Sequence, residues 1–376
     1  MLNLGMGVDS VSLLTRFMHE PDTRTFDLDQ LITISAMTGD EHDDTADAMN
    51  RHVLPLMRKH RLRYVQLSRA GQATSAGITV LNDSRTPAAM HMRGPWALSD
   101  ELAASGTLPP VARRACSQRA KGDVIDRWLA TELADTPYLH VKGYRHDETR
   151  RIAADIHPAT HNRHRDYPLH RWQWLRPHAA AHLHDTYGIT WPRSCCRYCP
   201  YQHSRTGLGA LVARWAALPD GAVQALILER LALALNPRQV LFGTRAAYQI
   251  VADHPQLHEA ARTAEHQLDT MPWAVYDVRR IFHAASADPQ RKGHAWRSVR
   301  RLTTTERADI EHALQDHAAM DRLPVITDQH AIPRAWHQHP GDRYPTLERY
   351  LTTAPALARD KERPQFARAW HQLTGT

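Results

Sequence analysis

The apolar positions in the first half of the chain follow two different periods in turn. Short apolar runs predict β-strands at Met1–Leu4, Leu31–Met37, Tyr64–Leu67 and Tyr138–Lys142. Helical spacing predicts helices over Val8–His19, Asp44–Arg61 and Lys121–Leu133, and Pro55 favours a kink or break inside the second of them. Because strands that alternate with helices form βαβ units, we expect an α/β fold with a parallel sheet of about five strands and helices on both faces.

Two later regions depart from this alternation. Residues 68–114 are rich in small and polar side chains without a clear period, which predicts a long functional or mobile loop. After Pro200 the strand signals fade, and the patterns over Leu208–Leu235 and Ala246–Leu268 are helical. Since 376 residues exceed one ordinary core, we expect a catalytic domain over residues 1–205 and a mainly helical C-terminal region over residues 206–376.

Net charge and hydropathy limit the classes of ligand and the cellular locations that we expect for this protein. Lys and Arg number 47 against 40 Asp and Glu, an excess of +7 that suits a phosphate-bearing ligand, small or polymeric. No apolar run approaches a membrane span, and the N-terminus lacks the features of a signal peptide. We therefore expect a cytoplasmic protein without a membrane partner. The chain starts directly at its first predicted strand, which leaves room for a few native residues before Met1.

A glycine-rich loop joins the first predicted strand to the first predicted helix. It reads Gly5-Met6-Gly7-Val8-Asp9-Ser10. Backbone N–H groups in such a turn and at a helix N-terminus form an anion site, and glycine lets the backbone approach a phosphate. Ser10 can donate its hydroxyl to a phosphate oxygen, and Asp9 can cap the helix or help to hold Mg²⁺. A tight strand–helix turn with an Asp cap is the alternative.

The four cysteines point to metal or thiol chemistry. They are Cys116, Cys195, Cys196 and Cys199, with three crowded together. So few cysteines in a chain of this length are a poor disulfide framework, and in a reducing compartment the pattern is more typical of metal ligation or a reactive thiol. Cys196-x-x-Cys199 has the spacing of metal ligands.

The glycine loop resembles the PP-loop, Ser-Gly-Gly-x-Asp-Ser, of the adenine-nucleotide alpha-hydrolase superfamily, with Gly5 and Met6 in place of its first serine and first glycine. Four further elements resemble those of the phosphoadenosine-phosphosulfate (PAPS) reductase-like branch, in the same order. They are Thr38-Gly39-Asp40-Glu41, Arg114-Ala115-Cys116-Ser117 with Lys121, Gly143 to Glu148 with Arg151, and Tyr167-Pro168-Leu169 to Trp174 followed by Ser194 to Tyr201. The resemblance covers about residues 1–205.

This resemblance implies a nucleotide site beyond the carboxyl ends of the strands. It implies that Gly5–Ser10, Thr38–Glu41, Gly143 and Glu148 hold ATP with Mg²⁺, and that Asp9, Ser10, Lys121 and Arg151 serve the chemistry. The implied reaction activates a substrate oxygen as an AMP ester, releases pyrophosphate, and lets a sulfur or nitrogen nucleophile displace AMP. The alternatives are a surface salt bridge for Glu148 with Arg151, a solvated lysine at Lys121, and capping of the helix near Asp43 by Asp40 and Glu41.

The resemblance also bears on the cysteines. Cys116, Cys196 and Cys199 resemble the paired cysteine blocks of iron–sulfur APS reductases and of DNA-phosphorothioation sulfurtransferases. That likeness implies a 4Fe–4S cluster, with tetrahedral zinc or metal-free thiols as the alternatives. Cys195 is then a spare thiol or a fourth ligand.

Three classes of function remain open. We expect an ATP-dependent sulfurtransferase or AMP-forming ligase, served by a sulfur-donor protein or a small thiol, with nucleic acid as a candidate acceptor. A PAPS or APS reductase is the second class, but it needs a nucleophilic cysteine late in the chain, and none follows Cys199. The third is a non-catalytic nucleotide- or nucleic-acid-binding module of a phage or defence system.

The basic stretch Arg279–Arg301, interleaved with Trp296, suits a nucleic-acid backbone, with a solvated helical face as the alternative.

Overall fold

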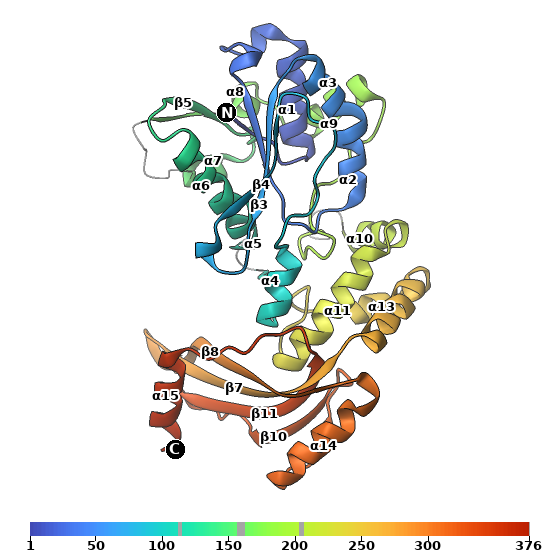
Figure 1. Ribbon diagram of the computed structural model, residues 1–376, viewed down its shortest axis with the longest axis vertical. Helices are drawn as coiled ribbons and strands as arrows, with labels where there is room; N and C mark the ends of the chain where they lie inside the picture. Colours follow the sequence, from blue (N-terminus) through green and yellow to red (C-terminus); the bar gives the residue numbers. More distant parts are fainter. Residues whose placement is uncertain (112–114, 156–161, 203–206, 376) are drawn as a thin grey trace. The chain divides into compact units, whose positions relative to one another are not determined.

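The computed structural model describes residues 1–111, 115–155, 162–202 and 207–375 (Figure 1). The chain divides into two compact units. Unit 1 contains Met1–Ser99 and Ala112–Cys199, and unit 2 contains Asp100–Val111 and Pro200–Thr376. The sequence places the boundary at residue 205 and does not indicate that residues 100–111 belong with the C-terminal unit.

Unit 1 is built on a six-stranded sheet in the order β4-β3-β2-β1-β5-β6. Its strands are β1 (Leu2–Asn3), β2 (Ile32–Ala36), β3 (Arg63–Arg69), β4 (Ile78–Ser84), β5 (Tyr138–Val141) and β6 (Arg163–Asp166). Neighbouring strands run parallel except β3 and β4, which are antiparallel. The predicted α/β class is confirmed, while the sheet is mixed because of the antiparallel edge strand β4.

Separate apolar clusters cover the two faces of this sheet. On one face, α1 (Val8–His19), α3 (Leu54–Lys59) and α9 (Arg176–Tyr187) pack around Leu2 and Tyr64. On the other face, α6 (Asp123–Glu132) packs on Ile34 and Val65. Successive residues of a strand point to opposite faces, which is why Tyr64 and Val65 belong to different clusters. Burial on both faces also explains why these strands read as continuous apolar runs.

The second predicted helix is divided into three parts. α2 (Asp43–Ala48) continues as the π-helical segment η3 (Met49–Val53), and α3 then begins at Leu54 with Pro55 in its first turn. Proline has no N–H to donate to the preceding turn, so the regular helical ladder cannot pass through it. The three segments follow one another without a gap, so the kink or break predicted at Pro55 takes the form of a π-helical segment just before it.

The prediction of one long loop over residues 68–114 is wrong for much of its length. β3 extends to Arg69, Ile78–Ser84 form β4, and α4 (Leu98–Ser105) follows. β4 pairs with a single neighbour and is only partly buried, with Val80 49% exposed. Its side chains therefore lack the clean alternation that marks a half-buried strand. The remaining helices of unit 1 are short: α5 (Ala115–Ser117), η5 (Gln118–Gly122), α7 (Thr149–Ala154) and α8 (Pro168–Arg171).

Unit 2 contains a five-stranded antiparallel sheet in the order β8-β7-β11-β10-β9. Its strands are β7 (Trp273–Ala285), β8 (Asp288–Thr305), β9 (Val325–Thr327), β10 (Pro333–Gln338) and β11 (Thr346–Pro355). Its helices are α10 (Gly207–Ala217), α11 (Asp220–Leu235), α12 (Ala247–Ala252), α13 (His258–Thr270), α14 (Ile310–Met320) and α15 (Pro364–Thr374). Tyr276 and Tyr350 pack with α11, whereas Val275 and Leu351 pack with α14.

The prediction of a mainly helical C-terminal region is therefore incomplete: the helices expected over Leu208–Leu235 and Ala246–Leu268 are present as α10 to α13, but the sheet was missed. Arg279 and Arg280 lie on β7, and Arg291 to Arg301 lie on β8, so the basic stretch is a strand hairpin and not a helical face. β8 is an edge strand with mostly exposed side chains. Its many charged residues hide the strand period, because an exposed edge does not need alternating apolar positions.

In the described ranges no single helix has both the length and the apolar character to cross a bilayer; α10 and α11 meet these criteria only as a pair bent by 107°.

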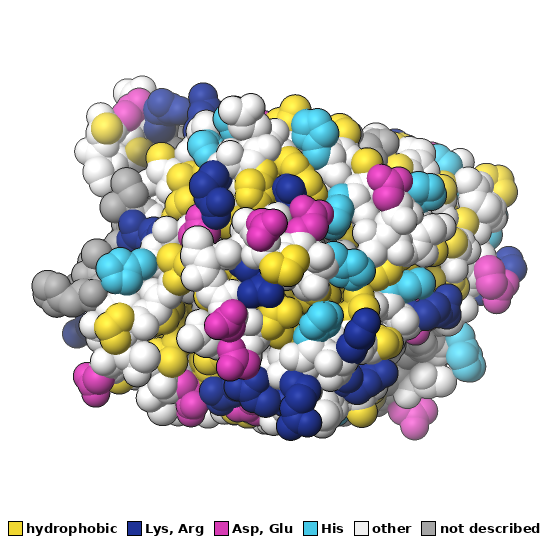
Figure 2. All heavy atoms as spheres, turned by 90° about the horizontal axis from the view of Figure 1, so that it is seen from above, with side chains coloured by type: hydrophobic (Ala, Val, Ile, Leu, Met, Phe, Trp, Pro, Cys, Tyr) yellow, Lys and Arg dark blue, Asp and Glu magenta, His cyan; other side chains and the backbone are white. Residues whose placement is uncertain are grey.

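The face shown in Figure 2 carries histidine, basic and acidic side chains interspersed with apolar ones. No one kind of side chain dominates that face.

Candidate functional site

The carboxyl ends of β1 and β5 define the candidate site. The chain passes from β1 outward to β2 and β3, and β5 then pairs with the other side of β1. In an open α/β sheet, a ligand crevice forms where the strand order reverses in this way. The glycine loop follows β1 and Gly143 follows β5. Two of the predicted nucleotide-binding elements therefore meet at this point.

The glycine loop is closed by its own serine. The Ser10 hydroxyl accepts a hydrogen bond from the Gly5 N–H (3.0 Å) and donates one to the Gly7 carbonyl (3.2 Å). Ser194 Oγ donates to the Gly5 carbonyl (2.9 Å) from a distant part of the chain. The sequence predicts that Ser10 donates to a phosphate, and the structure shows a further task for it, since its hydroxyl sets the conformation of the loop.

Met6 gives the loop its turn. Its φ of 58° lies in the left-handed region, which is uncommon for a residue other than glycine. The Met6 carbonyl accepts a hydrogen bond from Trp191 Nε1 (2.9 Å), and its side chain is 1% exposed within the apolar core of unit 1. Burial of this side chain and the bond from Trp191 offset the backbone strain.

Asp9 is not the helix cap that the sequence suggests. The N-cap of α1 is Gly7, and no side chain caps it, so the first amides of the helix remain available to an anion. The Asp9 carboxylate instead accepts hydrogen bonds from Arg145 Nη1 (2.7 Å) and Arg176 Nη1 (3.3 Å). Two guanidinium groups are thereby gathered beside the start of α1.

The loop after β5 passes very close to this helix. A Cβ atom at Gly143 would lie 3.2 Å from the carbonyl carbon and oxygen of Asp9. A Cβ there would require the two backbones to shift apart by a few tenths of an ångström, next to the contact between Arg145 and Asp9. Glycine at position 143 is thus favoured by close approach of two backbones and not by an unusual φ.

Glu148 links the arginines of this loop. Its carboxylate accepts hydrogen bonds from the Arg145 N–H (3.1 Å) and from Arg151 Nη1 (2.6 Å). Burial would raise the pKa of Glu148, but the bonds and charges of Arg151 and Arg145 lower it below its usual value. The Glu148–Arg151 ion pair, which the sequence offers as an alternative, does form. The Arg151 side chain is 52% exposed, and its guanidinium lies over the Tyr144 ring.

Thr38, Asp40 and Glu41 form a second, buried part of the site after β2. The Glu41 carboxylate accepts hydrogen bonds from the Thr38 N–H (3.1 and 3.2 Å) and pairs with Lys121 Nζ (2.9 Å). Burial alone would lower the pKa of Lys121, but the charge of Glu41 raises it above its usual value. Lys121 is therefore not the solvated lysine that the sequence allows as an alternative. Its ammonium group neutralises the buried Glu41 carboxylate, whether or not it also contacts a ligand.

Asp40 holds three neighbouring segments together. Its carboxylate accepts hydrogen bonds from the N–H and the hydroxyl of Ser99 (both 2.7 Å) and from the Tyr198 hydroxyl (2.8 Å). The N-cap of α2 is His42, with no side-chain cap, so capping of that helix by Asp40 and Glu41 is not observed. Gly39 has a φ of 84°, and a Cβ there would lie 2.6 Å from Ala97, which explains the glycine.

Cys195, Cys196 and Cys199 lie in the same segment as Tyr198. Cys196 forms an isolated antiparallel bridge with Glu41, and its Sγ is 3.3 Å from Thr38 Oγ1. The Cys199 N–H donates to the Cys196 carbonyl (3.0 Å), and Cys116 lies in α5, just before the segment that carries Lys121. Burial and the charge of Glu41 raise the pKa of the Cys196 thiol well above its usual value.

The cysteines, all described, form no disulfide. Within the described ranges no group of three or more His, Cys, Asp or Glu side chains is placed to hold a metal ion. As arranged, these side chains do not make a complete ligand set, and the metal centre stays a prediction.

Two residues of the site were not singled out by the sequence. Arg145 lies within a recognised motif but carries no assigned role there, and Arg176 lies outside every motif. Arg145 and Asp9 are 136 positions apart in the sequence, so no local sequence pattern indicates that they are in contact. For Arg145 the available signal was its place two residues after Gly143, inside a recognised motif.

Comparison with known proteins assigns no family. No protein-family model, curated protein or solved structure matches this chain.

The buried pair of Glu41 and Lys121 yields a stability prediction. Replacing Lys121 with Met should lower the free energy of unfolding by about 3 kcal/mol, because the Glu41 carboxylate loses its cation while buried. Chemical denaturation followed by circular dichroism measures the change. Adding Glu41→Gln in the same chain should restore part of the loss, since the charge is then removed. A single variant as stable as the wild type would show that Lys121 is a solvated lysine.

The cysteines yield a second prediction. Protein purified without oxygen should contain iron and show a visible charge-transfer band. Both should be lost in Cys196→Ser and in Cys199→Ser, while Cys195→Ser is the matched control if Cys195 is the spare thiol. Metal analysis for iron and zinc measures the outcome. A wild-type protein free of both metals and fully active would exclude the metal centre.

Proposed function

We propose that unit 1 binds ATP at the glycine loop and splits it into AMP and pyrophosphate, as the catalytic unit of an ATP-dependent sulfurtransferase or AMP-forming ligase. In this proposal the unit is a PP-loop domain of the PAPS reductase-like kind. The observation that carries it is the meeting of the uncapped start of α1 with Arg145 and Arg176 at the reversal of strand order. A helix N-terminus and gathered guanidinium groups are complementary to a polyphosphate.

Arg176, an exposed cation of the site, is placed to exchange Asp9 for a phosphate when the nucleotide binds. The Arg176 side chain is 48% exposed and holds Asp9 at 3.3 Å, a looser contact than the 2.7 Å of Arg145. A polyphosphate competes with Asp9 for Arg176 because it carries more negative charge. Arg145, whose side chain is 5% exposed, keeps its contacts and the shape of the site. Release of Arg176 would leave the Asp9 carboxylate with Arg145 as its partner and with capacity to hold Mg²⁺, which would neutralise phosphate charge.

The proposed chemistry is transfer of the adenylyl group. An acceptor oxygen attacks the α-phosphorus, the bond to the β-phosphate oxygen breaks, and pyrophosphate leaves with that electron pair. A sulfur or nitrogen nucleophile then attacks the activated carbon and AMP departs. The protein contributes positioning and charge neutralisation, through the first amides of α1 and the side chains of Arg151 and Arg176.

A sulfonucleotide reductase is the less favoured alternative. Such an enzyme needs a free, mobile cysteine that reaches both the nucleotide and a thiol partner. The cysteines all lie at or before Cys199, and Cys196 is tied to Thr38 and to Glu41. A cysteine held in this way is poorly placed to carry a thiosulfonate between two sites.

Nucleotide binding is tested by calorimetry with ATP and Mg²⁺. Ser10→Ala should weaken binding about tenfold, because the hydroxyl that closes the glycine loop is lost. Ser12→Ala is the matched control, since its hydroxyl donates to the Asp9 carbonyl within α1 and, unlike that of Ser10, does not bond Gly5 or Gly7. If both variants bind ATP like the wild type, the glycine loop is not the nucleotide site.

The reaction is tested by identifying the products formed from ATP. AMP and pyrophosphate should appear slowly with water as the acceptor, and Arg176→Gln should reduce their rate about tenfold or more. Arg171→Gln, an exposed arginine paired with Asp166, is the control. Formation of ADP would contradict the proposal. Sulfite released from PAPS and reduced thioredoxin would restore the reductase, and ATP binding without turnover would indicate a binding module.

A further inference from the structure

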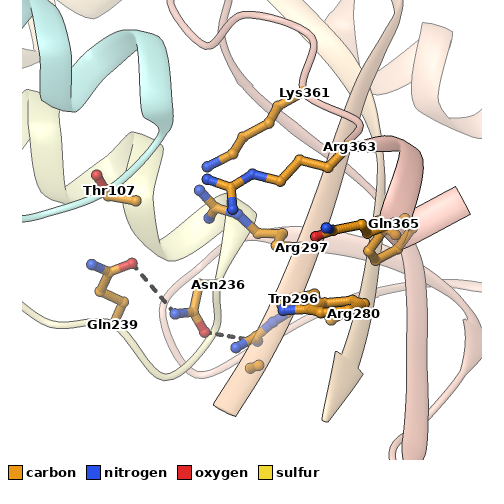
Figure 3. Close-up of a pocket in the computed structure, with 11 residues that line it drawn as sticks. Thr107, Asn236, Gln239, Arg280, Trp296, Arg297, Lys361, Arg363 and Gln365 are labelled. Carbon is orange, nitrogen blue, oxygen red and sulfur yellow. Dashed lines mark hydrogen bonds between the residues drawn. The ribbon is translucent and has the colours of Figure 1, made fainter. Parts of the chain in front are cut away.

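A cationic cavity of about 290 Å³ lies within unit 2 (Figure 3). Four of its lining side chains are basic: Arg280, Arg297, Lys361 and Arg363. Amide groups of Asn236, Gln239 and Gln365 also line it, and among the described lining residues none is acidic. The cavity is at the small end of the range for ligand sites, and its lining suits an anion that accepts several hydrogen bonds.

Arg297 contributes a positive charge that no carboxylate balances in the described structure. Its guanidinium donates hydrogen bonds to the carbonyl oxygens of Ser105, Gly106 and Leu235. Burial lowers the pKa of Arg297 to about 10, a value at which it is still charged at neutral pH. A desolvated cation bonded only to neutral oxygens is costly to keep without an anion nearby.

More cations gather beside the cavity around one aromatic ring. The Phe282 ring has Lys292 Nζ at 4.5 Å, Arg280 Cζ at 4.7 Å and Arg238 Cζ at 4.9 Å from its centroid. Glu348 pairs with two of these three cations, Arg238 and Arg280. Nearby, Glu362 is already paired with Arg279. The excess positive charge therefore extends beyond the cavity along the β7–β8 hairpin.

The start of α15 adds a dipole of the same sign. Arg363 is its N-cap, no side chain caps it, and its first turn contains no acidic residue. Helix N-termini normally attract acidic side chains, so a basic residue at this position is unfavourable unless an anion lies close by. Gln365 and Phe366, also in this first turn, line the cavity.

From these observations we propose that the cavity binds a phosphate group of a single-stranded nucleic-acid backbone. The cavity accepts one phosphate, and the row of cations along the hairpin suits the phosphates that follow in a polymer. Trp296 in the lining offers an aromatic surface to a neighbouring base. The proposal concerns unit 2 alone and does not depend on the ATP chemistry proposed for unit 1.

The test measures binding of a labelled single-stranded oligonucleotide of about 12 nucleotides to the full chain by fluorescence anisotropy. Replacing both Lys361 and Arg363 with Gln should raise the Kd about tenfold or more and reduce the slope of log K against log salt by about 1. The matched control replaces Arg245 and Arg262 with Gln. These two arginines pair with acidic residues elsewhere in unit 2 and give the same change in net charge.

A second variant keeps the test independent of folding. Gln365→Glu places a carboxylate in the first turn of α15, where it favours the helix but repels a phosphate in the cavity. Its melting temperature should hold or rise while its Kd rises. Unchanged binding in both variants, or equal weakening in the control pair, would overturn the proposal. Displacement of the oligonucleotide by AMP at the same phosphate concentration would reassign the cavity to a mononucleotide.

Discussion

The close approach of the β5 loop to the start of α1 is the constraint on which the unit 1 site depends. Gly143 lets two backbones approach so closely that a Cβ would lie 3.2 Å from the Asp9 carbonyl, and Arg145 contacts Asp9 from the same loop. Through Glu148, the same loop also fixes Arg151. The charges at this edge of the sheet are therefore arranged by backbone packing first, and the ion pairs follow from it.

Buried carboxylates organise the neighbouring part of unit 1. Asp40 joins the segments that contain Ser99 and Tyr198, and Glu41 joins Thr38 to Lys121. Each of these acids is nearly inaccessible, so each needs several donors to remain charged. Residues that the family resemblance assigns to the nucleotide thus also hold the loops in place, and a loss of activity on mutation would not by itself separate the two roles.

The sequence predicts the parallel core well and the edges poorly. β2 and β3 are recognisable because their side chains are buried on both faces, and the break at Pro55 follows from proline chemistry. β4 and β8 are edge strands whose polar, exposed residues lack a period. In the site, the motifs at Gly5–Ser10, Thr38–Glu41 and Gly143 follow strands as expected. The partners of Asp9 could not be foreseen, since contacts between distant positions leave no local pattern.

Met6 has a consequence for the thermodynamics of ligand capture. Its left-handed backbone is maintained by a buried side chain and by Trp191, so the turn exists before any ligand arrives. The conformational entropy of ordering this loop is lost when the chain folds. A ligand that docks there meets a rigid cradle and gives up little flexibility of the protein on binding. Recognition at this loop is therefore closer to lock-and-key than to induced fit.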